Sequence, residues 1–583
     1  MRKNGTVNGQ FIIHNAAAAR WLRFENPHRI IVTNRIEEVL PALQQIENLV
    51  NENEWYAAGF LCYEAAGAFD PALITRAPGD FPVLWFGLYE KPQPTDLPFP
   101  DFQSYSLGET VPSVNQSDYG KDIARIKKHI GAGDTYQVNY TLRLLTPFSG
   151  DPWHLFLAMV RAQSPGYAAW ADIGRYAICS ASPELFFRLE GNRLTCKPMK
   201  GTVKRGRTQK EDESLAEWLR LSEKNRAENL MIVDMIRNDL GRVADTGSVQ
   251  VPGMFQIERH PTLWQMTSTV TADCTKSVSE IFTALFPCAS ITGAPKIRTT
   301  QLISELEPAP RGIYTGCIGF IAPGRSVQFN VAIRTAVIDR SSHQAEYGSG
   351  GGIVWDSVPD DEYTEALLKS RVLREQRPDF SLLETMLWTP EEGYFLLEHH
   401  LRRLADSAVY FGCPATADQI QAHLIERASG FGREPQRVRL LISGSGAVQI
   451  EATPFVNPPR APVVVKLARD PVNSSDIFLY HKTTQRRTYE AAQRSQPDCE
   501  DVLLWNERGE LTESCVANLV LEINGKLLTP PVDSGLLAGT FRAWLLEQGI
   551  IREHVLKTSD LNRCSKIYLV NSLRKWREAT VRS

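Results

Sequence analysis

The sequence predicts a protein of mixed α+β and α/β class with two domains, the first having a β-sheet-rich core with surrounding helices. Its 583 residues exceed the roughly 100–200 residues of one ordinary domain. Residues 10–110 alternate short apolar runs with the amphipathic stretch 36–52, which is typical of strands mixed with helices. At 372–381 a helical pattern runs out into a proline, and we therefore place the domains at 1–375 and 379–583.

The composition is that of a globular protein without affinity for polyanions. Hydrophobic residues make up 43% and charged residues 22%, which provides ample core. A net charge of −3 gives no electrostatic basis for binding nucleic acid or an anionic membrane. The ten cysteines are scattered without metal-ligand spacing, as in a reducing compartment, and no apolar run has the length of a membrane span or signal peptide. We therefore expect a cytoplasmic protein.

Residue patterns predict the elements of the first domain in order. The proline-rich stretch 91–102 predicts a surface loop. Helical spacing of apolar residues predicts a helix over 118–131, and alternation predicts a strand over 136–144. Residues 211–243 keep helix-compatible spacing throughout, so a long helix is expected there.

One lysine has an unusual local sequence. Within CKPMKGTVKRG, residues 196–206, Pro198 keeps the backbone extended before Lys200, and Gly201 permits a turn or a close approach after it. A lone Lys-Gly-Thr is more often a solvated turn. Lys200 becomes a candidate functional amine because acids, an arginine and glycines follow in similarly constrained settings.

Two acidic segments offer ligands for a hard cation. Glu228 lies just before the apolar part of 211–243. Pro359 predicts the start of a second helix, in which Glu362 and Glu365 are three residues apart and share a face. Hard cations bind carboxylate oxygens, and one protein carboxylate is too few, so both helices would have to meet. The plainer alternatives are a solvated Glu228 and acids that complement a helix dipole.

An arginine and a glycine cluster are candidates for binding an anion. Residues 326–338 alternate as a strand that carries Arg334 among apolar neighbours, and a buried arginine needs either a bound anion or an internal salt bridge. Residues 348–352 hold four glycines, whose N–H groups can form an anion nest. Lys296 follows Pro295 at the opening of a helix, but the spacing of a phosphate-binding Walker loop is absent.

Four of these segments resemble the chorismate-utilising enzymes, the family of anthranilate synthase component I, aminodeoxychorismate synthase component I and isochorismate synthase. They are GDTYQVN, PMKGT, KNRAENLMIV and TGAPK, at 133–139, 198–202, 224–233 and 292–296. In this resemblance, a lysine at the position of Lys200 is the nucleophile that marks aminodeoxychorismate synthases. Gln265 stands where many relatives have a histidine, which leaves the general acid or base open.

The resemblance also implies ligands for the other groups. Glu228 and Glu365 would ligate Mg²⁺, with Glu362 acting directly or through water. The substrate, the dicarboxylate chorismate, would be bound by Arg334, Tyr314, Gly350, Gly351 and Lys296.

The second domain resembles fold-type IV pyridoxal-phosphate enzymes, and most of all aminodeoxychorismate lyase. Its segments LLETM, FLYHK, ELTES and LLAGT occur in the order and spacing of that class. The resemblance implies that Lys482 binds the cofactor covalently and that Glu513 pairs with the pyridinium nitrogen. Arg403 and the N–H groups of Gly539 and Thr540 would hold the phosphate.

Taken together, these features predict a bifunctional enzyme of 4-aminobenzoate and folate synthesis. It would aminate chorismate, a transaminase-class activity, and then act as a lyase on the product. No cysteine lies in a glutaminase-like turn, so ammonia would come from a separate glutamine amidotransferase. A homodimer through the second domain is one arrangement that the resemblance allows. Two alternatives remain: an anthranilate synthase-type enzyme fused to a class IV aminotransferase, and a non-catalytic sensor derived from these enzymes.

Overall fold

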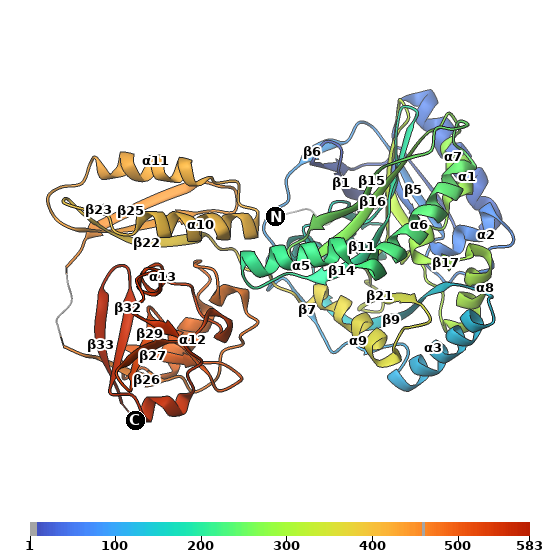
Figure 1. The fold of residues 1–583 in the computed structure, drawn as a ribbon. Helices are drawn as coiled ribbons and strands as arrows, with labels where there is room; N and C mark the ends of the chain where they lie inside the picture. The colour runs from blue at the N-terminus through green and yellow to red at the C-terminus, as the bar shows by residue number, and fades with distance from the viewer. Residues whose placement is uncertain (1–8, 457–460, 583) are drawn as a thin grey trace. The chain divides into compact units, whose positions relative to one another are not determined.

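A computed structural model describes residues 9–456 and 461–582 (Figure 1). The chain forms two compact units. The first unit comprises the chain up to Lys204 and residues Ala216–Arg377. The second unit comprises Arg205–Leu215 and the chain from Pro378 onward. A short piece of the predicted first domain therefore belongs to the second unit.

The first unit contains two large antiparallel sheets. One sheet has the strand order β17 (Gly293–Ala294), β9 (Gln137–Gly150), β21 (Gln344–Ile353), β20 (Thr335–Asp339), β11 (Tyr176–Ser180), β10 (Ala169–Asp172), β1 (Gln10–Asn15), β2 (Arg20–Phe24) and β6 (Gln93–Thr95), with β7 (Tyr105–Leu107) and β8 (Val111–Pro112) also on β9. The other has the order β14 (Met199–Lys204), β16 (Leu263–Asp273), β13 (Arg193–Lys197), β12 (Leu185–Glu190), β19 (Ser326–Val331), β18 (Cys317–Ala322), β4 (Tyr56–Leu61), β5 (Leu84–Tyr89) and β3 (Arg29–Thr33), with β15 (Gln250–Arg259) on β16.

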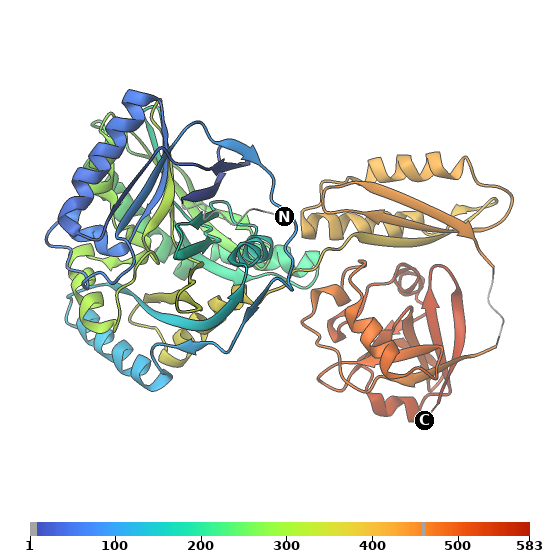
Figure 2. The ribbon, with the colours of Figure 1, turned by 180° about the vertical axis from the view of Figure 1, so that it is seen from behind.

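Helices cover these sheets and bring side chains to the strands that matter for the site. They are α1 (Ile36–Asn53), α2 (Ala66–Phe69), α3 (Gln116–Gly131), α4 (Pro152–Gln163), α6 (Glu223–Gly241), α7 (Val278–Leu285), α8 (Lys296–Leu306) and α9 (Pro359–Lys369). Helix α6 packs on β14 and β16, whereas α9 packs on β21 and α3, as Figures 1 and 2 show. Aromatic rings fill the core, where Phe282 lies 5.2 Å from Phe187 and 5.0 Å from Phe329.

The second unit has two sheets of its own. A small antiparallel sheet consists of β23 (Gly393–Tyr394), β22 (Leu382–Thr389), β24 (Gln436–Ile442) and β25 (Val448–Pro454), with α10 (Leu397–Phe411) and α11 (Ala417–Ala428) alongside it in both views. The larger, mixed sheet has the order β28 (Leu511–Ser514), β27 (Asp501–Trp505), β26 (Val463–Leu467), β33 (Lys575–Val581), β32 (Lys566–Asn571), β29 (Asn518–Ile523), β30 (Lys526–Thr529) and β31 (Arg552–Glu553). Helices α12 (Arg487–Ser495) and α13 (Thr540–Glu547) complete the unit.

The mixed fold class and several elements are confirmed, but three sequence predictions need correction. The helix expected over 211–243 is two helices, α5 (Gln209–Leu221) and α6, because Ser222 leaves the helical conformation and caps α6 through Asn225 N. The strand expected over 326–338 is β19 and β20 in different sheets, separated by a crossover in which Arg334 has φ +49°. The loop expected at 91–102 includes the short strand β6.

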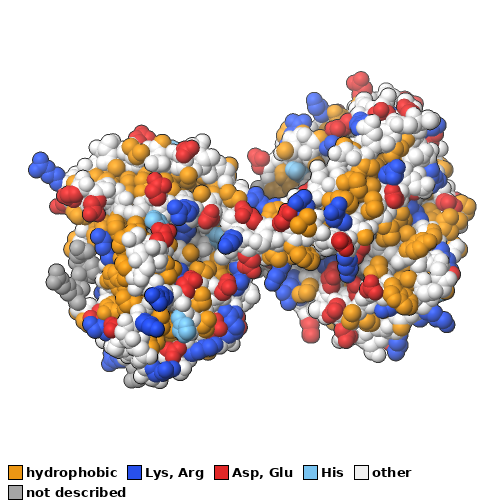
Figure 3. Space-filling model, in the orientation of Figure 1, with side chains coloured by type: hydrophobic (Ala, Val, Ile, Leu, Met, Phe, Trp, Pro, Cys, Tyr) orange, Lys and Arg blue, Asp and Glu red, His pale blue; other side chains and the backbone are white. Residues whose placement is uncertain are grey.

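The surface agrees with the charge balance of the sequence. On the face drawn in Figure 3, acidic and basic side chains are interspersed without a broad region of one sign. Among the described residues, no helix combines the length and apolar character needed to cross a bilayer.

Candidate active site

A cavity of about 460 Å³ in the first unit collects most of the residues that the sequence singled out. Strand β14, helices α6 and α9, the glycine strand β21 and the β19–β20 crossover all contribute to its wall. The predicted residues that line it are Lys200, Glu228, Gln265, Tyr314, Arg334, Gly350, Gly351, Glu362 and Glu365. Segments more than a hundred residues apart in the sequence therefore meet at one place.

Lys200 lies on β14, partly buried in the cavity wall. Burial lowers the pKa of its amine, while the carboxylates of Glu228, Glu184 and Glu365 oppose that shift. A β-carbon at Gly352 would lie 2.8 Å from Lys200 Nζ, so the glycine leaves room for the amine. The structure thus favours a neutral amine more than a solvated turn lysine would allow.

Three carboxylates reach the same cavity from two helices. Glu228 comes from α6, and Glu362 and Glu365 come from α9. Glu362 accepts a hydrogen bond from Ser357 Oγ at 2.7 Å, and burial raises the pKa of its carboxyl. Glu365 pairs with Lys369 at 2.9 Å, which lowers the pKa of Glu365.

This donor set fits Mg²⁺. The described residues hold no cluster of three or more His, Cys, Asp or Glu side chains close enough to form a metal site alone. Mg²⁺ does not need one, because it is usually held by one or two carboxylates and keeps several waters or substrate oxygens. Glu228 and Glu365 offer those carboxylates, and burial of Glu362 adds negative charge that a cation would compensate.

Arg334 and Tyr314 form a side of the cavity suited to a carboxylate. The Arg334 guanidinium donates to Gln163, a neutral amide, and burial lowers the pKa of Arg334. Burial raises the pKa of Tyr314 to about 12, so its hydroxyl remains a donor. A β-carbon at Gly348 would come 2.1 Å from the Tyr314 ring, which explains one of the glycines.

Two sequence predictions about this site are not supported by the geometry. Residues 348–352 lie inside β21, paired with β9, so their N–H groups do not form the turn-like nest expected of the glycine cluster; Lys369 Nζ donates to Gly350 O at 2.7 Å. Lys296 is not among the residues lining the cavity. Its ammonium pairs with Asp239 at 2.7 Å and donates to the carbonyl of Leu285.

One acidic residue of the cavity was missed in the sequence. Glu184 is buried, accepts a hydrogen bond from Ser290 Oγ at 2.6 Å, and has its pKa raised to about 7, mainly by burial. Gln265 cannot take its place, because its amide donates to the carbonyl of Gly201 at 2.8 Å and has no titrating proton. The available signal was a carboxylate within the apolar run SASPELFF, where an acid is costly unless it has a role.

The second unit brings its predicted residues together around Lys482. Burial lowers the pKa of Lys482 to about 8, and the charges of Arg403, Glu384 and Glu513 also act on its amine. Glu513 is buried, with its pKa raised to about 7 by burial. Its carboxylate accepts hydrogen bonds from Tyr489 Oη at 2.8 Å and Asn518 Nδ2 at 3.1 Å, two partners that the sequence did not indicate.

A buried charge cluster supports the predicted phosphate site. Arg403 donates twice to Glu384, at 2.9 and 2.6 Å, and His400 contacts the same carboxylate at 2.7 Å. The Arg403 guanidinium and its neighbours hold the pKa of Glu384 at about 2 despite burial.

Helix α13 offers backbone donors beside this cluster. Its N-cap, Gly539, makes no side-chain capping bond to the first turn, and Thr540 Oγ1 lies 3.3 Å from His400 Nε2. Uncapped N–H groups beside an arginine fit a phosphate. Arg403 is already bidentate with Glu384, so the helix terminus would supply most of the direct contacts.

Comparison with known proteins places both halves. Residues 7–375 match the model of the chorismate binding enzyme family, and residues 381–581 match that of amino-transferase class IV. Aminodeoxychorismate synthase component 1 of Bacillus subtilis is 38% identical over 267 residues, covering 46% of this chain and 56% of that protein. Anthranilate synthase component 1 of Aquifex aeolicus is 37% identical over 277 residues, covering 47% and 54%. The chain thus spans little more than half of either relative.

The fold comparison agrees with the family match. The crystal structure of anthranilate synthase component I from Streptococcus pneumoniae superposes with a TM-score of 0.53 at 22% identity, covering 64% of this chain and 94% of that one. The predicted fold of the first half is therefore confirmed, with a class IV domain match after it. Since the family model matches more than half of its length, the chain belongs to the chorismate binding enzyme family.

Proposed function

We propose that this protein makes 4-aminobenzoate, the folate precursor, in two steps. Residues 1–375 would aminate chorismate with ammonia to 4-amino-4-deoxychorismate, and residues 379–583 would eliminate pyruvate from that product. The observation that carries the proposal is the amine of Lys200 in one cavity with Glu228, Glu365 and Arg334. A nucleophile, cation ligands and a carboxylate-binding group are the parts that this chemistry requires.

The side chains of the first site have complementary roles. The lowered pKa of Lys200 makes the neutral amine available for attack on the chorismate ring. The hydroxyl that leaves the ring needs a proton, and Glu184, with a pKa of about 7, is placed to give it. Ammonia then replaces the lysine and the amine is restored. Arg334 and Tyr314 would hold a carboxylate of the substrate during these steps.

The carboxylates of α6 and α9 would hold Mg²⁺. Glu228 and Glu365 would bind it directly, and Glu362 directly or through water. Bound there, Mg²⁺ would supply a positive charge that stabilises an anionic substrate and its leaving group. Lys369, which pairs with Glu365, would be released to solvent or to the substrate.

The second site fits pyridoxal phosphate, the cofactor that the class IV match implies. The cofactor supplies an electron sink for bond cleavage. Lys482 would attach it, and the amine, with a pKa near 8, can later take up a proton from the substrate. Glu513, fixed by Tyr489 and Asn518, would hold the proton on the ring nitrogen. The first turn of α13 and Arg403 would hold the phosphate.

The partners follow from the same chemistry. Ammonia would come from a separate glutamine amidotransferase, as the printed name "component 1" of the relative suggests. We propose a cytoplasmic protein with small-molecule substrates and without nucleic acid or membrane partners, and a homodimer through the class IV half.

An anthranilate synthase-type reaction is the second candidate, since the Aquifex relative is nearly as similar as the Bacillus one. Lys200 decides against it: a reaction with ammonia alone at the ring has no use for a buried amine beside the carboxylates.

Product analysis tests the proposal. The purified protein is incubated with chorismate, ammonium, Mg²⁺ and pyridoxal phosphate, and the aromatic product is identified by chromatography and mass spectrometry. We expect 4-aminobenzoate, and 2-aminobenzoate as the main product would refute the proposal. In Lys482→Ala the amino intermediate should accumulate while chorismate is still consumed. Lys204→Ala, an exposed lysine on the same strand as Lys200, is the matched control for the first site.

A further inference from the structure

The second unit is built from two separate pieces of chain. Strand β14, which carries Lys200, ends at Lys204 in the first unit. The following segment, Arg205–Leu215, belongs to the second unit, and the chain returns to the first unit at Ala216. We call Arg205–Leu215 the inserted segment. It lies within the residues that match the chorismate binding family, so the family match gives no reason for its position.

The inserted segment is closed by a buried ion pair. Arg205 donates to both oxygens of Asp212 at 2.7 Å, and the two side chains are only 6% and 1% exposed. Asp212 also accepts the backbone N–H of Gly206 at 2.8 Å. A β-carbon at Gly206 would lie 2.2 Å from Asp212 N, so the loop closes tightly only around a glycine. Such a pair is costly to break from one side, because the remaining charge stays buried.

This loop docks on Tyr410 of α10. Tyr410 Oη donates to Gly206 O at 2.7 Å, and Arg205 donates to the Tyr410 carbonyl at 2.9 Å. The Arg205 guanidinium also lies 4.3 Å from the centre of the Tyr410 ring. Tyr410 is 2% exposed, so these contacts are made in the interior of the second unit.

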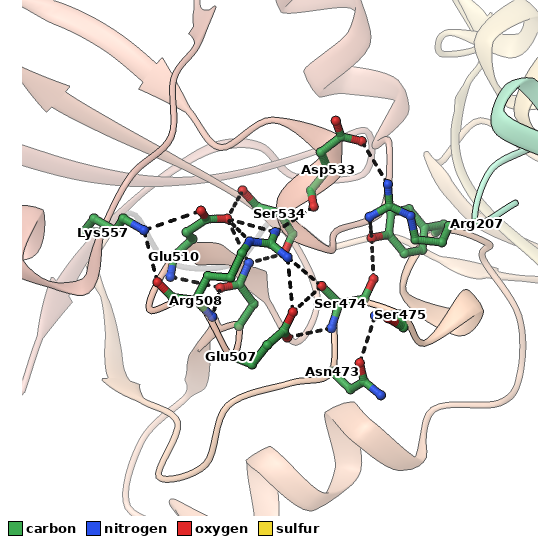
Figure 4. Close-up of polar contacts among 12 residues, drawn as sticks. Arg207, Asn473, Ser474, Ser475, Glu507, Arg508, Glu510, Asp533, Ser534 and Lys557 are labelled. Atoms are coloured by element: carbon green, nitrogen blue, oxygen red, sulfur yellow. Dashed lines mark hydrogen bonds and ion pairs between the residues drawn. The ribbon is translucent and has the colours of Figure 1, made fainter. Parts of the chain in front are cut away.

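The contacts continue to the two residues before Lys482. The ring of His481 lies 4.3 Å from that of Tyr410, and its Nδ1 is 2.9 Å from Ser407 Oγ. Arg207 donates to Tyr480 Oη at 3.1 Å, and Tyr480 in turn donates to Ser474 O at 2.7 Å. Figure 4 shows Arg207 at the edge of this polar network, with its second contact to Asp533.

Lys482 is thus held from both sides in sequence. Its own carbonyl accepts the N–H of Leu383 at the start of β22, while Tyr480 and His481 are fixed against the inserted segment. We propose that the inserted segment positions Lys482, with Arg205 and Asp212 as positioning residues that act through Tyr410, His481 and Tyr480. The inference rests on the proposed function only in treating Lys482 as the lysine that binds the cofactor.

The test uses the full chain with Arg205→Gln, Asp212→Asn and the milder Tyr410→Phe, which removes only the hydroxyl bonded to Gly206. Arg220→Gln is the matched control, because Arg220 pairs with Glu217 on the same helix α5 but both are about half exposed. Amide hydrogen exchange is measured without cofactor. Exchange of Tyr480–Lys482 should rise at least about tenfold in the three variants and stay within about twofold in the control.

Exchange in β24 separates positioning from a loss of stability. Positioning predicts that β24 keeps its protection while Tyr480–Lys482 lose theirs, and that bound pyridoxal phosphate leaves about tenfold faster. Equal loss of protection throughout the second unit, or unchanged exchange at Tyr480–Lys482 in Tyr410→Phe, would overturn the inference. If borohydride does not fix pyridoxal phosphate to Lys482 in the unaltered protein, the proposed function fails instead, and the exchange result still decides the structural role.

Discussion

Lys482 should destabilise the cofactor-free second unit at neutral pH. Its pKa falls from an ordinary 10.5 to about 8, chiefly because folding removes the charged amine from water. At 1.36 kcal/mol per pKa unit, the cost is at most about 3 kcal/mol, and less where cavity water still reaches the amine. The sign follows from proton binding: between pH 8 and 10.5 the unfolded chain binds more protons, so stability rises with pH.

Replacing Lys482 by methionine, which has a similar length and no charge, isolates this effect. Below pH 8 the full cost is present, so the variant should be more stable than the original protein without cofactor. By linkage, that advantage should shrink by as much as about 2 kcal/mol between pH 7 and pH 9.5. Only the difference between the two proteins matters, because other groups titrate equally in both.

Urea denaturation at several pH values provides the measurement. A chain of two units need not unfold in one step, so the transition of the second unit is identified as the one that pyridoxal phosphate shifts in the unaltered protein. Lys526→Met, at an exposed lysine of β30 in the same unit, serves as the control and should show no such pH dependence. A constant stability difference between Lys482→Met and the original protein from pH 7 to 9.5 would refute the reasoning.

Four further predictions concern single side chains. Glu384→Gln should destabilise the cofactor-free second unit by about 3–5 kcal/mol in the same urea assay, because it leaves the buried Arg403 charge uncompensated; a loss below about 1 kcal/mol would contradict this. Lys200→Ala should lose nearly all chorismate consumption without a change in unfolding, and normal rates with ammonium would make Lys200 a mere turn residue. Glu228→Gln and Glu365→Gln should raise the Mg²⁺ concentration needed for half-maximal rate by tenfold or more while pyridoxal phosphate still binds, which a magnesium titration measures. Glu184→Gln should remove the limb of the pH–rate profile near pH 7, and a profile unchanged in shape would exclude Glu184 as the proton donor.

Local sequence was sufficient for features that depend on short-range chemistry. Pro359 fixes the start of α9, and Glu362 and Glu365 then face one way because of helix geometry alone. The strand before Lys200 and the positive φ of Gly201 likewise follow from Pro198 and glycine. The mixed fold class also follows from such periodicity.

Features set by tertiary packing could not be obtained in that way. Arg334 is in an alternating apolar run, but its φ of +49° belongs to a crossover between two sheets, which no local period indicates. Glu184 looks like an isolated acid until burial and Ser290 give it a pKa near 7. Lys296 matched a familiar segment, yet Asp239, 57 positions earlier in the chain, decides where its amine points.

The inserted segment changes how the joining of the two halves should be understood. A linker that only tethers two enzymes would leave each unit complete on either side of Arg377. Here a cut at that point would remove Arg205–Leu215 from the second unit, and Gly206 O would no longer accept the hydroxyl of Tyr410. The faces of Tyr410 and Tyr480 that the segment covers would become exposed, next to the lysine on which the second reaction depends. The chain that leaves Lys200 at the end of β14 is the same chain that braces Lys482, so the two sites share a structural element as well as a substrate.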